Sequence, residues 1–105
     1  MPKYSGVRIS NGAEVLVIPP MNLRMVRENS ADVFEAPKED EKAIDVMNRR
    51  LPLVLAAVQR NYPDYTEDQL MDFASLRIWP DMWAAALGTK NLPEVPGESE
   101  PAAQA

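Results

Sequence analysis

The sequence contains neither cysteine nor histidine. Without cysteine, disulfide bonds, thiolate nucleophiles and zinc–thiolate sites are excluded. Without histidine, the usual general base, the imidazole metal ligand and the Ser-His and Cys-His nucleophile pairs are excluded as well. A glycine-rich phosphate loop and a Ser-x-x-Lys arrangement are also missing. We therefore expect a protein that is not an enzyme and that uses no cofactor or metal.

Positive charge is also scarce, because 11 Lys and Arg residues face 16 Asp and Glu residues and give a formal net charge of -5. A duplex-binding surface normally has the opposite sign, since neutralising phosphates supplies much of its affinity. The apolar runs are far shorter than a membrane span, and no signal-peptide pattern opens the sequence. We expect a soluble intracellular protein with neither nucleic acid nor membrane as a partner.

The 105 residues are 46% apolar, which is typical of one small globular domain. Residues 1–89 are expected to form that domain. Residues 90–105 contain three prolines, several acids and few large apolar side chains, and are expected to form a disordered acidic Pro-rich tail.

A β-hairpin is predicted near the N-terminus. Two β-prone runs, residues 7–10 and 13–18, flank an Asn-Gly pair at positions 11–12, and Asn-Gly is the strongest short-range hairpin signal. A two-residue turn would pair Ser10 with Ala13. The prolines at 19–20 end the second strand because proline cannot donate a ladder hydrogen bond.

The predicted hairpin is apolar on both faces. One face carries Val7, Ile9, Leu16 and Ile18. The other presents Val15 and Val17 beside Arg8. A strand that is apolar on both sides needs cover on both. We therefore expect a homo-oligomer in which Val15 and Val17 contribute to self-association.

Helices are expected for most of the remaining chain. Asn22 is placed to cap a short helix over residues 23–28, with Leu23 and Val26 facing inward. The acid-rich segment 28–41 is interpreted as a solvated connector. Arg49, Arg50 and Arg60, in the helix that follows, are expected to pair with nearby acids such as Asp45 and Asp64, and a basic stripe on that helix is the alternative.

A long amphipathic helix is predicted from about residue 37 or 38 to Pro63. Its apolar stripe recurs every three or four positions and consists of Ile44, Met47, Leu51, Leu55, Val58 and Tyr62. Pro52 lies inside this helix and is expected to kink it.

Two further helices follow. Thr66 and Gln69 form a capping box that starts a helix over residues 67–73. The last helix is predicted to begin at Pro80 and to stop at Gly88. The predicted fold is therefore mainly α, with an N-terminal β-hairpin followed by about four helices, one of them long and kinked at Pro52.

Two tryptophans and two methionines are candidates for contact with a partner. Trp79 and Trp83 are four positions apart, and two indoles exceed what so small a core must hold. Met21 and Met25 offer flexible thioethers that adapt to several partner shapes. Packing in the core is the alternative role for each of the four, and the sequence leaves both open.

Three segments resemble tail assembly chaperones of long-tailed bacteriophages, a family that is also found in prophages and phage-like elements. They are IPPMNLR at 18–24, AVQRNYPD at 57–64, and TEDQL at 66–70, followed by a Leu-containing linker and a last helix that match 76–88. The resemblance covers about residues 7–88. The chain departs from the pattern at residues 77–79, where smaller or more aliphatic side chains are expected.

The resemblance implies a non-enzymatic chaperone in the host cytoplasm. Such a protein coats the long, aggregation-prone tape measure protein until tail tube protein polymerises around it, and it is absent from the mature virion. Many genes of this family also yield a longer product by ribosomal frameshifting.

Two other classes of function stay open. A small acidic domain can act as a DNA-mimicking inhibitor, although here the acids cluster in the connector and at helix starts instead of along one face. A structural tail or head-completion component of the virion is the second alternative.

Overall fold

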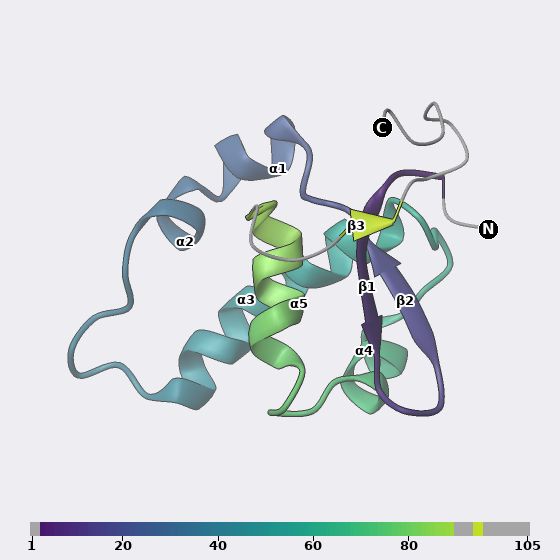
Figure 1. Cartoon of the computed structure of the whole chain (residues 1–105). Coiled ribbons are helices and arrows are strands. Elements are labelled where there is room, and N and C mark those ends of the chain that lie inside the picture. The colour runs from purple at the N-terminus through teal and green to yellow at the C-terminus, as the bar shows by residue number, and fades with distance from the viewer. Residues whose placement is uncertain (1–2, 90–93, 96–105) are drawn as a thin grey trace.

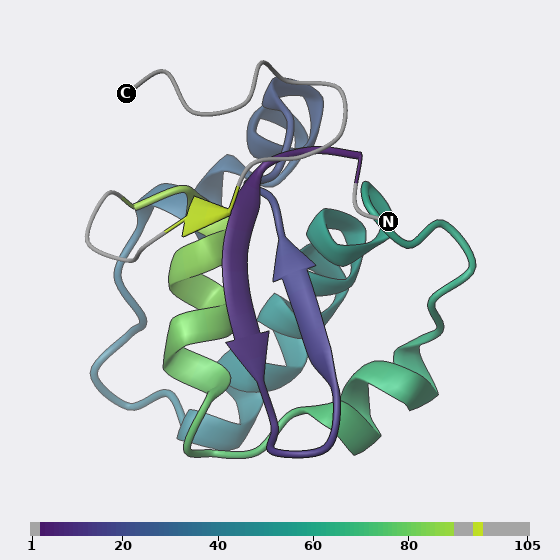
Figure 2. The ribbon, with the colours of Figure 1, turned by 45° about the vertical axis from the view of Figure 1, so that its right-hand side comes forward.

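The computed structural model describes residues 3–89 and 94–95. Within them the helices and strands, in chain order, are β1 (Gly6–Ser10), β2 (Val15–Ile18), α1 (Leu23–Glu28), α2 (Ser30–Phe34), α3 (Ala43–Gln59), α4 (Glu67–Phe73), α5 (Trp79–Leu87) and β3 (Glu94–Val95) (Figure 1). The strands form one antiparallel sheet in the order β2-β1-β3. The sheet lies over α3 and α5 as a separate layer (Figure 2). The N-terminal hairpin and the predominance of helix are confirmed.

The hairpin has the predicted faces but a different register. Ser10 pairs with Val15 instead of Ala13. The reason is the Asn11 side chain, whose Oδ1 accepts hydrogen bonds from the backbone N–H groups of Ala13 (2.9 Å) and Glu14 (2.7 Å) and closes a wider loop. The shift is by two positions, an even number, so every side chain keeps its face. Val7, Ile9, Leu16 and Ile18 are all buried in the core, as predicted.

Side chains from the turn that follows α3 cover part of the outer edge of β2. The Tyr62 hydroxyl accepts a hydrogen bond from the Val17 N–H (2.9 Å), and Asn61 Nδ2 donates to the Val17 carbonyl (2.9 Å). Both backbone groups of Val17 that face away from β1 are therefore satisfied within the chain. At Val17 this edge is therefore blocked against pairing with another strand.

The opposite edge of the hairpin is covered by β3. Gly6 pairs with Val95, and Val7 pairs with Glu94. These two residues belong to the segment that was predicted to be a disordered tail, and the edge of β1 offers them backbone hydrogen bonds. The rest of the predicted tail, residues 90–93 and 96–105, lies outside the described residues.

Helix α1 has the predicted bounds, and Asn22 Oδ1 accepts from the Met25 N–H as expected of its cap. The expected inward position of Leu23 is wrong, since Leu23 is 85% exposed while Val26 packs against the core. Helix α2 was not predicted and raises the number of helices in the described residues to five. Both short helices stand to one side of the sheet and α5 (Figure 1).

Arg49 on α3 holds α2 in place. Its Nε lies 2.6 Å from Asp32 Oδ1, and its Nη1 also pairs with Glu41. The acid-rich segment is thus partly structured instead of being only a solvated connector. Arg49 pairs with these distant acids and not with Asp45, because the chain folds back over α3 and brings them within reach.

Replacing Arg49 with glutamine is expected to loosen α2. The pairs are only partly buried, so the loss of unfolding free energy should be modest, about 1 kcal/mol. Amide hydrogen exchange should accelerate over residues 30–34 and stay unchanged in the core of α3. Arg27→Gln, which removes an exposed cation from α1, is the control. Equal exchange in both variants would contradict this role of Arg49.

Helix α3 begins at Ala43, later than predicted. Lys38 and Glu41 form a closed turn in which the Glu41 N–H donates to the Lys38 carbonyl and the Lys38 N–H donates to the Glu41 carboxylate. This turn uses the residues that were expected to start the helix. The helix runs through Pro52 to Gln59, and the expected kink at Pro52 stays a prediction.

The last two helices follow their local signals. The Thr66–Gln69 capping box is present, with Gln69 N–H to Thr66 Oγ1 at 3.1 Å and Thr66 N–H to Gln69 Oε1 at 2.8 Å. Helix α4 has the predicted bounds, and α5 begins one residue earlier than predicted. Gly88 ends α5 with a left-handed φ of 77°.

The core lies between the sheet, α3, α4 and α5. Leu51 and Val58 of the predicted stripe are buried, whereas Met47, Leu55 and Tyr62 are half-buried. Ile44, the first residue of the stripe, is 53% exposed. The apolar stripe is therefore exposed to solvent at the N-terminal end of α3.

Candidate functional site

Three large exposed apolar side chains meet around one hollow. They are Ile44 on α3, Met71 on α4 (57% exposed) and Leu76 in the α4–α5 linker (86% exposed). Met47, Leu51 and Trp79 line the same hollow, which has a volume of about 360 Å³. We call the surface formed by these six residues the α3–α5 groove.

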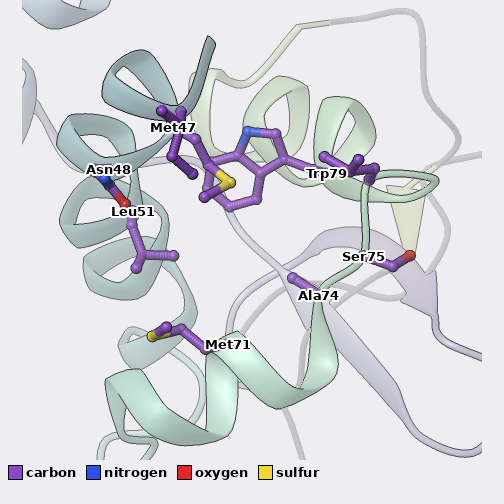
Figure 3. A pocket seen from close by; sticks show the side chains of 9 residues that line it. Met47, Asn48, Leu51, Met71, Ala74, Ser75 and Trp79 are labelled. Atoms are coloured by element: carbon purple, nitrogen blue, oxygen red, sulfur yellow. The ribbon is translucent and has the colours of Figure 1, made fainter. Parts of the chain in front are cut away.

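The position of Trp79 follows from a turn in the linker. The Ser75 carbonyl accepts hydrogen bonds from the N–H groups of Ile78 (3.1 Å) and Trp79 (2.8 Å), which turns the chain into α5. The Trp79 indole then extends from the start of α5 toward Met47 on α3 (Figure 3). Trp79 is half-buried, so it both packs against the core and forms a wall of the groove.

A second hollow of about 610 Å³ continues the groove toward the start of α3. It shares Ile44, Met47, Leu76 and Trp79 with the first and extends to Pro37, Glu41 and Arg50. Arg50 is the cation at this end of the groove. Its guanidinium carbon lies 4.6 Å from the centre of the Trp83 ring, a cation–π contact.

Arg50 forms no ion pair among the described residues, and its polar atoms are only partly satisfied. Its Nε is buried without a hydrogen-bond partner. Burial and the neighbouring positive charge of Arg49 lower the pKa of Arg50 from its usual value, with a partial offset from Asp32. Among the described residues, the ion pairs in this region go to Arg49, which binds both Asp32 and Glu41.

The structure separates the four residues predicted to contact a partner. Trp79 lines the groove, and Trp83 lies under Arg50, half-buried against the core. Met21 is buried in the core, and its N–H donates to the carbonyl of Ala86 (2.8 Å), at the opposite end of α5 from Trp79. Met25 is half-buried on α1 and packs against the core. Of these four residues, Trp79 lines the groove and the other three do not, and contact of any of them with a partner stays a prediction.

Sequence reasoning missed most of the groove. Ile44 and Met47 were assigned to the inward stripe of α3, although their place at its start was a signal that the core could end before them. Met71 and Leu76 carried no signal, since their exposure depends on how α4 and the linker lie against α3.

The predicted self-association surface is only partly present. Val15 is exposed, but Val17 is buried and its backbone is bound by Asn61 and Tyr62. Arg60, also expected to pair with an acid, instead donates to the Pro20 carbonyl and lies 4.3 Å from the Tyr4 ring centre. Self-association stays a prediction, now with Val15 as its exposed residue.

Over residues 3–89 and 94–95, no group of three or more acidic side chains is placed to hold a metal ion. No helix in the same residues has the length and hydropathy to cross a bilayer.

Comparison with protein-family models, with curated proteins and with solved structures finds no match to the chain. Its function is therefore inferred from the groove and from the sequence motifs.

Proposed function

We propose that the protein is a non-enzymatic phage tail assembly chaperone that binds the tape measure protein in the α3–α5 groove. The observation that carries this proposal is the exposure of Ile44, Met71 and Leu76 around one apolar hollow. Clustered apolar side chains in water promote aggregation, and on a small domain such a cluster marks a surface for a partner. The resemblance to tail assembly chaperones supports the tape measure protein as that partner.

The chemistry of the groove suits a client with many different binding segments. Met47 and Met71 provide flexible, polarizable walls, and Trp79 provides a large rigid one. Such walls accept the apolar face of a helix through shape and area, without a fixed pattern of hydrogen bonds. A long helical client presents this kind of face repeatedly.

In this proposal the chaperone acts in the host cytoplasm and leaves the client when tail tube protein polymerises. It is then absent from mature particles, whereas a structural tail or head-completion component would be present in them. Mass spectrometry of purified virions separates these two functions.

Leu76→Gln is expected to impair the chaperone without impairing folding. Leu76 is almost fully exposed, so its replacement removes little packing from the domain itself. If it is a main contact in the complex, binding should weaken by about 2 kcal/mol. Co-expression with the tape measure protein of the same phage should give a soluble client with the wild-type chain and a mostly insoluble one with the variant.

Leu23→Gln provides the matched control. Leu23 is equally exposed but lies on α1, outside the groove. This variant should keep the client soluble. Loss of solubility in both variants would place the binding surface elsewhere, and an insoluble client with the wild-type chain would overturn the proposed function.

A further inference from the structure

Arg50 gives the groove an electrostatic preference as well as an apolar one. Its side chain lines the second hollow, which continues the groove beside Ile44, Met47 and Trp79. The carboxylate of Glu41 lines the same hollow but is bound by Arg49. The groove therefore combines an apolar floor with one cation that forms no ion pair among the described residues.

Any partner that fills the groove also removes water from Arg50. Covering an unpaired charge with purely apolar atoms is unfavourable, because the charge loses hydration without a replacement. A carboxylate at the same place restores the lost interactions through charge-assisted hydrogen bonds, for which the planar guanidinium is well suited. The groove thus discriminates between partners by what they place against Arg50.

We infer that the α3–α5 groove binds an amphipathic helix whose apolar face is flanked by an Asp or Glu side chain facing Arg50. This inference rests on the proposed function and specifies the segments of the client that are recognised. The carboxylate is needed locally and not along the whole helix, because the chain carries a net charge of -5 and repels a uniformly acidic partner.

Three synthetic helices test the inference directly on the wild-type protein. Each has about 20 residues, long enough to form a helix, with Leu at i, i+3, i+4 and i+7 and one variable position beside the apolar face. The variable residue is Glu, Gln or Lys. By fluorescence anisotropy the Glu peptide should bind about tenfold more tightly than the Gln peptide, and the Lys peptide should bind more weakly still. Equal affinities for the three would overturn the inference.

Replacing Arg50 tests whether this residue recognises the charge at the variable position of the peptide. In Arg50→Gln the preference for the Glu peptide over the Gln peptide should disappear. Arg8→Gln is the control, because it changes the net charge by the same amount at an exposed position of β1. In this control the preference should persist. Circular dichroism checks that Arg50→Gln is folded. If Arg50→Gln is unfolded, Arg50→Lys is used instead. Arg50→Lys keeps the positive charge and should therefore retain a preference for the Glu peptide. A preference that persists in a folded Arg50→Gln would overturn the inference.

Three outcomes separate this inference from its alternatives and from the proposed function. If a second copy fills the groove, light scattering will show an oligomer that Leu76→Glu dissociates, and no peptide will bind; this would overturn the inference. If the wild-type chain solubilises the tape measure protein but the peptides show no charge preference, only the inference fails. If the peptides show the preference but the client stays insoluble, the proposed function fails instead.

Discussion

Replacing Gly6 with alanine is expected to cause a large loss of stability. A Cβ at this position would lie 2.4 Å from the carbonyl carbon and oxygen of Ile18 and 2.6 Å from the nitrogen of Pro19. These are backbone atoms at the end of β2, and the side chains of Ile18 and Pro19 are fully buried. The strand has no room to retreat, so the clash must separate the hairpin.

The cost should be about 3 kcal/mol or more, which lowers the melting temperature of a domain of this size by roughly 15 °C. Thermal unfolding followed by circular dichroism measures it. The control is Gly12→Ala, where an added Cβ meets no atom within 4 Å and only the φ of 97° resists it. That variant should lose about 1 kcal/mol. Equal losses in the two variants would show that close approach at Gly6 is not the cause.

Asn61→Ala should have the second-largest effect. Asn61 is 7% exposed, and its side chain joins three backbone groups: Oδ1 accepts from the Tyr4 N–H (2.6 Å), and Nδ2 donates to the carbonyls of Tyr4 (3.0 Å) and Val17 (2.9 Å). Alanine leaves these groups without their partner in a part of the chain that water reaches poorly. A loss of about 3 kcal/mol is expected, measured by urea denaturation.

Tyr62→Phe is the smaller companion change. It removes only the hydroxyl that accepts from the Val17 N–H and should cost about 1 kcal/mol. Asn61 and Tyr62 both bind the backbone of Val17. The loss of unfolding free energy in the double variant should therefore differ from the sum of the losses in the two single variants. Strict additivity would show that the two side chains act independently on this strand.

The features predicted correctly from sequence are those set by residues close together in the chain. Asn22 caps α1, Thr66 and Gln69 cap each other, and Gly88 ends α5, each through contacts that span only a few residues. The faces of the hairpin were predictable for a related reason, since alternation along a strand does not depend on which residues pair.

The candidate site was predicted in part. Trp79 was identified as a candidate for partner contact, and it lines the groove. Met21 and Met25 were named as candidates together with Trp79, although they lie outside the groove. The type of a residue indicates that its side chain can contact a partner, but it does not give the position of that side chain in the fold. Leu76 was not predicted to contact a partner, because a single leucine in a linker belongs to no periodic pattern.

By itself the sequence determined the absence of cysteine and histidine chemistry, the ends of three helices, and the apolar faces of β1, β2 and most of α3. Tertiary structure alone decided the features that join distant segments. These are the Arg49 pairs that hold α2, the Asn61 and Tyr62 contacts with β2, and the addition of β3 to the sheet. It also decided where the core stops. The first turns of α3 extend beyond the core, so the apolar stripe that is buried at Leu51 becomes an exposed groove at Ile44, and Arg50 comes to lie beside it without a carboxylate partner in the described part of the chain.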